Sequence, residues 1–305
     1  MATVSPGLIK LTKPASSKRL SSPPITLKCF LSSKKKTSGG FFTTSPPPLI
    51  YTKMKLTVSS SHIRKSSFIS EYSKFILGCV YLRIRLGPAG VPTVSVKRST
   101  VDGIRTVAEL GLDAMEVEFV RGVAMSLEGA EEAGRIADQL GVRLSVHAPY
   151  FINLCSQDRK VAEASKKRIV DSALRAERMG AVEVVVHPGY YGSLTPEQAY
   201  KLVKQRYGEL SDELKAKGVK VAEVAFETTG KVSQFGTLEE LVSLSKETGC
   251  LICVDFAHIY ARQAGKVDYA EVFDGLKPLK PKHLHAHFSG IEWTQAKRGE
   301  GGNEK

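Results

Sequence analysis

The chain has 305 residues, enough for one large domain or two small ones, and a formal net charge of +13. Residues 1–70 hold twelve of the 44 Lys and Arg residues and no Asp or Glu, which leaves 32 basic against 31 acidic residues elsewhere. The charge therefore gives no evidence for a nucleic-acid-binding face on the folded part, although net charge does not exclude a local basic patch.

Residues 1–80 are expected to be a disordered basic leader. They are rich in Ser, Thr, Pro and Lys, with lysines at 34–36 and prolines at 46–48, and they show no sustained apolar period. A Ser-rich, basic and nearly acid-free leader is typical of an organellar transit peptide, and the excess of Ser over Arg favours a plastid. A mitochondrial or nuclear location, a plain disordered tail and a start at Met54 are the alternatives.

Neither a membrane span nor a disulfide framework is indicated. The apolar segment 75–82 is far shorter than the roughly 20 residues of a membrane helix. The five cysteines are scattered, which suits a reducing compartment. Cys250 and Cys253 lie three apart on an expected strand and so face opposite sides of it, as two packed core cysteines would.

From residue 81 onward, expected strands and helices alternate. Apolar runs and turn signals predict strands at 82–86, 114–120, 143–147, 182–187, 219–227, 250–255 and 283–287. Ser or Thr at the start and Gly at the end predict helices at 98–111, 126–140, 158–179, 193–218, 237–248 and 267–276. Seven strands of an α/β domain covering 81–305 are thus expected.

Side chains of metal-ligand type follow five consecutive strands. They are His147, His187, Glu227, Asp255 (with His258 three residues on) and His287. The successive spacings are 40, 40, 28 and 32 residues, each close to one strand–helix unit of roughly 30 residues or more. Such residues meet only if the strands are parallel neighbours that end at one rim, which predicts a TIM-type β/α barrel with its chemistry at that rim.

The residue types predict more than one metal ion. A lone His is commonly structural and a carboxylate can pair with Lys or Arg, but closing apolar strands with Glu227 and Asp255 is costly without a cation. Mixed His and carboxylate donors suit zinc, iron or manganese better than calcium. An excess of ligands over one tetrahedral site points to the multi-metal hydrolysis of phosphate esters.

The histidines at 283, 285 and 287 alternate, so on a strand all three face the barrel interior. Only His287 is expected at the rim. His285 is expected in mid-barrel behind the ligands, and His283 at the opposite end of the barrel.

At these residues the chain resembles the endonuclease IV family of abasic-site endonucleases, especially its shorter archaeal-like members. The matching stretches span about residues 84–305 and read LGPAGVP, AMEVEFVRG, HAPYFINL, HPGYY, FETTG, CVDFAHIYAR and HAHFSGIEW. The resemblance implies a xylose-isomerase-like barrel that carries up to three zinc ions. It also implies hydrolysis of the phosphodiester 5′ to an abasic site in DNA, in base excision repair.

The resemblance also implies a role for each residue. His147, His187 and Glu227 would bind one zinc, and Glu227 would bridge to a second zinc held by Asp255 and His287. His258 would reach a third. The nucleophile would be water whose pKa the zinc lowers to about 7. Tyr150 matches a tyrosine at the DNA-facing rim of the family. Apart from the resemblance, Tyr190 after His187 is expected to face DNA by stacking on a base or sugar, with ordinary loop packing as the alternative.

The family pattern continues beyond Lys305 with an Asp-x-His-type pair and a late Glu. The eighth strand is therefore expected to be missing, leaving one or two zinc ions and an uncertain activity. A monomer is expected if the barrel is complete. The alternatives are a metal-dependent sugar isomerase or epimerase on the same barrel, and a remnant that binds DNA without cutting it.

Overall fold

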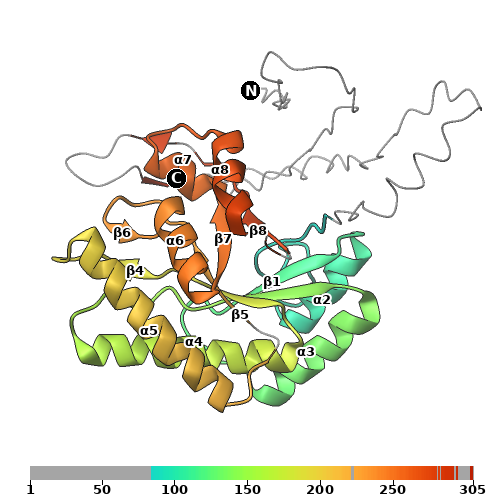
Figure 1. The fold of residues 1–305 in the computed structure, drawn as a ribbon. Coiled ribbons are helices and arrows are strands. Elements are labelled where there is room, and N and C mark those ends of the chain that lie inside the picture. Colours follow the sequence, from blue (N-terminus) through green and yellow to red (C-terminus); the bar gives the residue numbers. More distant parts are fainter. Residues whose placement is uncertain are drawn as a thin grey trace, which may run out of the picture. The chain divides into compact units, whose positions relative to one another are not determined.

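Parallel strands form the centre of the molecule (Figure 1). The structure, a computed structural model, describes residues 84–220, 223–279, 281, 283–291, 293–294 and 303–304. Six strands form one sheet in the order β1-β2-β3-β5-β7-β8, and every neighbouring pair is parallel. They are β1 (Ala114–Glu118), β2 (Arg143–His147), β3 (Glu183–Val186), β5 (Glu223–Glu227), β7 (Leu251–Asp255) and β8 (His285–His287). The described strands thus form a parallel half-barrel, consistent with an incomplete form of the barrel that the spacing predicted.

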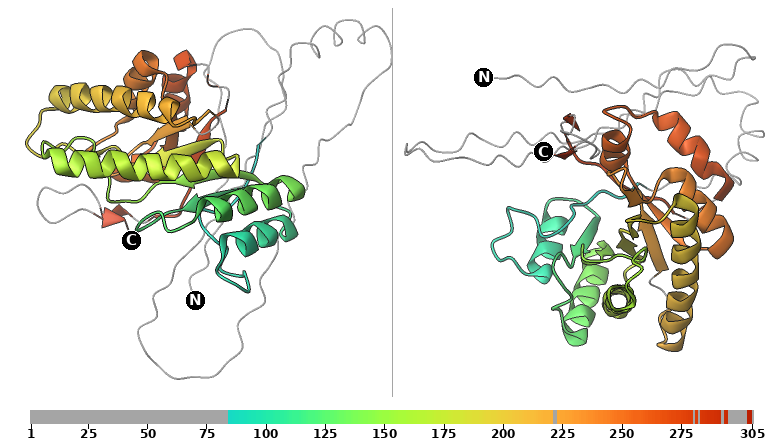
Figure 2. Two further views of the ribbon diagram at one scale, coloured as in Figure 1. Left: turned by 90° about the horizontal axis from the view of Figure 1, so that it is seen from below. Right: turned by 90° about the vertical axis from the view of Figure 1, so that its left-hand side faces the viewer.

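Helices connect the strands and lie on the outside of the curved sheet, as the two views of Figure 2 show. They are α2 (Thr100–Glu109), α3 (Leu127–Leu140), α4 (Arg159–Met179), α5 (Pro196–Ala216), α6 (Leu238–Thr248), α7 (Phe256–Arg262) and α8 (Tyr269–Leu276). The expected caps are confirmed at α5 and α6, where Thr195 and Thr237 form capping boxes with Gln198 and Glu240.

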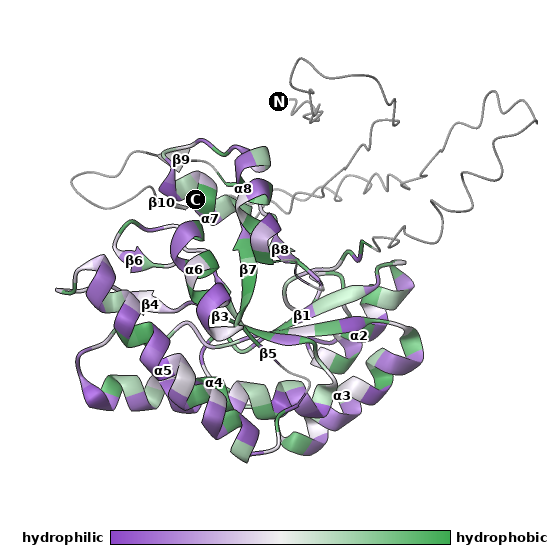
Figure 3. Cartoon of the chain, in the orientation of Figure 1, coloured by the Kyte–Doolittle hydropathy of each residue, from purple (hydrophilic) through white to green (hydrophobic). Residues whose placement is uncertain are grey.

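Two apolar clusters occupy the two faces of the sheet. The larger lies between strands and helices and contains Phe226 and Cys250. Figure 3 shows β7 coloured as hydrophobic, whereas hydrophobic and hydrophilic residues alternate along the helices. The smaller consists of Val185, Ala225 and Cys253. The two cysteines are therefore buried on opposite faces, as expected. Because these residues of the smaller cluster are small, the barrel interior has room for polar side chains.

The strand expected at 82–86 is not seen among the described residues, which begin at residue 84. Instead, the segment from Leu86 to Gly90 runs beside β1 and forms an isolated parallel bridge between Ala89 and Glu116. The amide N–H groups of Ala114 and Glu116 donate to the carbonyls of Leu86 and Pro88. Pro88 has no N–H to donate, which prevents a regular ladder.

Helix α7 is a second difference from expectation. We expected a loop after β7, but α7 begins directly at Phe256, with Asp255 as its N-cap. Four short strands were also unforeseen: β4 (Gly189–Tyr190) pairs with β6 (Gln234–Phe235), and β9 (Trp293–Thr294) pairs with β10 (Asn303–Glu304). A 3-10 turn, η1, covers Lys277–Leu279.

The leader expected at residues 1–80 lies outside the described residues. Among the helices that the structure does describe, none is both long and apolar enough to cross a membrane.

Candidate metal centre

The Glu227 carboxylate lies at the centre of the site. It ends β5 and is 1% exposed. Its Oε2 atom lies 3.0 Å from His147 Nε2 and 2.8 Å from His187 Nε2. His147 ends β2 and His187 directly follows β3, so the strand order β2-β3-β5 brings these three residues side by side. We call them the His147 group.

The other oxygen of Glu227 faces a second set of imidazoles. Oε1 lies 3.2 Å from His258 Nδ1 and 3.1 Å from His287 Nδ1. Asp255 Oδ2 lies 3.6 Å from the same His258 atom and 3.7 Å from the same His287 atom. We call Glu227, Asp255 and His258 the Asp255 group. The structure therefore brings together all six residues proposed as ligands, and Glu227 belongs to both groups.

Each group has the dimensions of a metal site. One ligand atom from each of His147, His187 and Glu227 lies within 4.8 Å of the others, and the same holds for Glu227, Asp255 and His258. Imidazole nitrogen and carboxylate oxygen are donors that zinc accepts in a tetrahedral site. The residues present therefore fit the zinc that the family resemblance implies.

Backbone contacts orient the imidazoles. His147 Nδ1 lies 2.8 Å from the carbonyl oxygen of Ala148, to which it donates a hydrogen bond. In a neutral ring, His147 Nε2 then presents a lone pair to the Glu227 carboxylate. Two lone pairs at 3.0 Å require a proton or a cation between them.

The Glu227 carboxylate and the imidazoles around it shift each other's pKa values. Burial raises the pKa of Glu227, but the imidazoles, His187 foremost, lower that pKa well below its ordinary value. Burial lowers the pKa of His147, but Glu227 raises it above its ordinary value. Without metal, then, Glu227 and His147 each stabilise the charged form of the other. A divalent cation bound there would take the place of the His147 proton.

Asp255 is held by Thr228, the residue after Glu227. The Thr228 hydroxyl accepts a hydrogen bond from Asp255 N at 2.8 Å and donates to Asp255 O at 3.2 Å. The Thr228 carbonyl lies 2.9 Å from His258 Nδ1, and Asp255 Oδ1 accepts from His258 N at 2.7 Å. Burial raises the pKa of Asp255. Thr228 and helix α7 thus orient two members of the Asp255 group.

Glu116 was missed by the sequence reasoning. It lies on β1, is 5% exposed, and places Oε1 3.1 Å from His287 Nε2 and Oε2 3.6 Å from His285 Nε2. Ser145 donates a hydrogen bond to its Oε2. Burial raises the pKa of Glu116, but contacts led by His287 lower it overall. No signal marked it, because Met-Glu-Val-Glu alternates apolar and acidic residues as a strand with one solvent-facing side does.

The three alternating histidines face the interior, as expected. His285 Nδ1 lies 2.8 Å from Glu183 Oε1, and His283 Nε2 lies 3.3 Å from Glu183 Oε2. Burial raises the pKa of Glu183, but these histidines lower it to about 2. Glu183 is at the start of β3. His285 therefore lies deeper in the barrel than His287 at the rim, and His283 lies deeper still.

Both tyrosines expected to face DNA are partly exposed at the rim. The Tyr150 ring is 5.4 Å from that of His147 and 5.8 Å from that of His187, and the residue is 50% exposed. Burial of its hydroxyl raises the Tyr150 pKa to about 12. Tyr190 is 43% exposed on β4, and its backbone N–H donates to Asn153 Oδ1. A Cβ on Gly189 would lie 2.2 Å from that Asn153 oxygen, so only glycine fits there.

Comparisons with known proteins agree with this architecture. The xylose isomerase-like TIM barrel family matches residues 104–303. An uncharacterized protein of Methanocaldococcus jannaschii is 35% identical over 228 residues, which cover 72% of this chain and 79% of that protein. A probable endonuclease 4 of Acholeplasma laidlawii is 28% identical over 139 residues, which cover 43% of this chain and 46% of that protein. The chain spans about half the length of the probable endonuclease 4 proteins it matches.

Among solved structures, D-psicose 3-epimerase from Clostridium cellulolyticum H10, determined with D-tagatose, superposes with a TM-score of 0.53 and 17% identity. The superposition covers 67% of this chain and 73% of the epimerase. At this identity the likeness concerns the fold alone. The chain belongs to the xylose isomerase-like TIM barrel family.

Proposed function

We propose that the protein is a zinc-dependent phosphodiesterase that cuts DNA on the 5′ side of abasic sites. One observation carries the proposal: the two oxygens of Glu227 face two different groups of ligands. A carboxylate with this arrangement can hold two cations side by side. Paired cations are characteristic of in-line displacement at phosphate esters, where they stabilise the attacking and the leaving oxygen.

The residues of the chain have separable roles in this proposal. The His147 group would bind one cation and the Asp255 group a second, with Glu227 shared between them. The cations would supply Lewis acidity toward a phosphodiester. Tyr150, half exposed beside the His147 ring, is placed to stack against a sugar or base at the mouth of the site. Because Glu227 and His147 are buried, their side chains are held by packing and do not sample the rotamers of solvent-exposed residues.

The names of the relatives support the same choice. Several probable endonuclease 4 proteins match between 26% and 32% identity. A sugar epimerase reaction is the competing possibility, because D-psicose 3-epimerase shares the fold. Such a reaction would use one or two metals, so the large number of ligands gathered around Glu227 favours the phosphodiesterase.

The test uses the full chain, loaded with zinc, and a DNA duplex with one abasic site at a known position. We expect a single cut 5′ to that site that leaves an extendable 3′ hydroxyl, and we expect chelation to abolish it. Glu227→Gln should lower the cleavage rate by at least about 100-fold, since a buried ligand loses its charge. Glu223→Gln is the matched control, because Glu223 begins the same strand and is exposed.

If the zinc-loaded wild type cuts no faster than Glu227→Gln, the proposal is wrong. A parallel reaction with D-tagatose and manganese distinguishes the competing possibility. Epimerisation of the sugar without DNA cleavage would assign the site to the epimerase class instead.

A further inference from the structure

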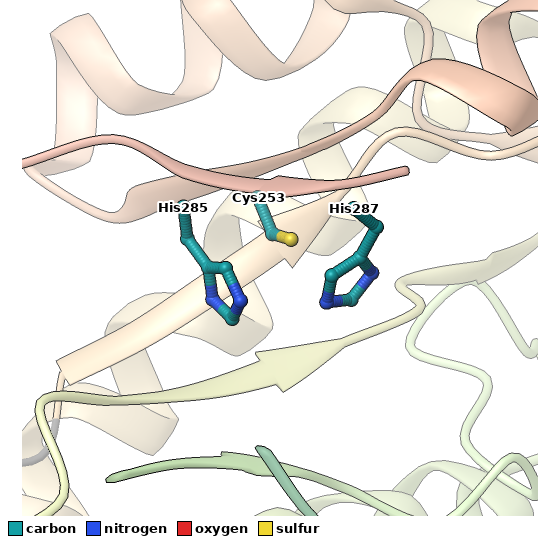
Figure 4. Close-up of side chains that lie close together, drawn as sticks. All are labelled: Cys253, His285 and His287. Atoms are coloured by element: carbon teal, nitrogen blue, oxygen red, sulfur yellow. The ribbon is translucent and has the colours of Figure 1, made fainter. Parts of the chain in front are cut away.

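A further set of potential ligands, which shares His287 with the rim, includes residues that lie two positions before Asp255 and His287 on their strands. Figure 4 shows Cys253, His285 and His287 projecting into the interior, with the sulfur atom between the two imidazoles. One ligand atom from each lies within 4.8 Å of the others. Cys253 precedes Asp255 by two residues on β7, and His285 precedes His287 by two on β8. Each pair therefore shares one face of its strand.

Glu116 approaches the two histidines of this set from the opposite side of the barrel. Its two oxygens lie 3.1 Å from His287 Nε2 and 3.6 Å from His285 Nε2. Glu116 is on β1 and both histidines are on β8, which are the two edge strands of the six-stranded sheet. The contact therefore spans the interior and does not run along the hydrogen-bonded ladder.

The polar atoms in this contact lack ordinary partners. Within the described part of the chain, neither Glu116 Oε1 nor His287 Nε2 has a hydrogen-bond partner, although the two buried atoms are 3.1 Å apart. Their separation suits a hydrogen bond but their alignment does not, and unsatisfied buried polar atoms are costly. Two ligands about 2.1 Å from a tetrahedral zinc lie about 3.4 Å from each other, so a cation between these atoms would satisfy both.

We propose that Glu116, Cys253, His285 and His287 bind a structural divalent cation of the zinc class. One thiolate, two imidazoles and one carboxylate make a four-donor set, and the sulfur disfavours magnesium, calcium and manganese. On binding, the Cys253 thiol loses its proton to solvent as the metal–sulfur bond forms, so the charge added by the cation is partly balanced. We call these residues the interior group.

The interior group would act as a tie across the barrel. It links β1 to β8, the two ends of the described strand order, and to β7 beside β8, and so restrains two sheet edges. His287 connects it to the rim, because its Nδ1 faces Glu227 while its Nε2 faces Glu116. A cation in the interior group therefore also orients His287 toward the Glu227 cluster.

The test depends on sulfur, which neither of the two groups around Glu227 contains. The full chain is stripped of metal and reloaded with cobalt, and its ultraviolet absorption and metal content are measured. We expect the thiolate-to-cobalt charge-transfer band in the wild type. Cys253→Ser should lose the band and about one metal equivalent per chain, because one four-donor site holds one ion. Cys250→Ser is the matched control and should keep both, because Cys250 lies in the outer core.

A wild-type protein that binds cobalt without a thiolate band would overturn the proposal, as would a band that survives in Cys253→Ser. If Cys253→Ser does not fold, the wild-type spectrum still decides, and Glu116→Gln provides a second variant with the thiol intact. We expect Glu116→Gln to weaken the cobalt affinity that the band reports by at least tenfold; an unchanged affinity would remove Glu116 from the site. The proposed DNA cleavage does not enter these readouts, so the two proposals can fail independently.

Discussion

Replacing Thr228 by valine tests how the Asp255 group is positioned. The change keeps the shape of the side chain but removes the hydroxyl that bonds both the N–H and the carbonyl of Asp255. Thr228 is 1% exposed, so water cannot take the place of the hydroxyl. The buried Asp255 N–H is left unsatisfied, which costs about 1–3 kcal/mol of unfolding free energy. Urea unfolding followed by circular dichroism measures this loss.

Thr228→Ser is the control, because it keeps the hydroxyl and loses one methyl group, worth about 0.8 kcal/mol. The same valine variant should weaken zinc binding about 10- to 100-fold, as removal of a group that orients a ligand typically does. A valine variant as stable as the serine variant, with wild-type zinc affinity, would refute the role given to Thr228.

Three further outcomes follow from the structure. Burial opposes ionisation of Glu183, but two histidines lower its pKa to about 2 from an ordinary 4.5. The ionised Glu183 carboxylate therefore stabilises the fold fully above about pH 4.5, and this stabilisation is lost as the pH falls toward 2. The stability difference between wild type and Glu183→Gln in metal-free protein should shrink over that range, and a constant difference would contradict this. Gly134→Ala would place a Cβ 2.6 Å from the carbonyl oxygen of Met179, so it should destabilise the fold by about 1–3 kcal/mol. Gly129→Ala in the same helix should not destabilise it, and equal effects of the two substitutions would count against this packing. Chelation should lower the melting temperature and added zinc should restore it, an effect that is absent if the cluster binds no metal.

The positions of the rim residues could be predicted because two simple constraints act on them. An apolar strand buried on both faces must end near the rim, and parallel neighbours must end at the same rim. His147, His187 and Glu227 each directly end such a run, so their convergence followed from the sequence. His258 required only its spacing from Asp255. The prediction missed helix α7, which carries His258, because nothing between Phe256 and Arg262 signals a helix that starts without a loop.

The deeper residues could not be predicted in the same way. Glu116 looks like a solvent-facing residue of a half-buried strand, and only closure of the sheet turns that face toward His287. Cys253 was expected to be buried and is buried, but its proximity to His285 and His287 depends on the pairing of β7 with β8. Contacts across a barrel interior are set by sheet curvature, which the order of apolar and polar residues does not specify.

The most direct test of the central claim is a crystal structure of the zinc-reconstituted chain, with anomalous difference maps at the zinc absorption edge. The account predicts separate peaks about 2.0–2.2 Å from each oxygen of Glu227, one contacting His147 and His187 and the other contacting Asp255. If maps from crystals soaked with excess zinc show a peak beside neither oxygen of Glu227, they contradict the account.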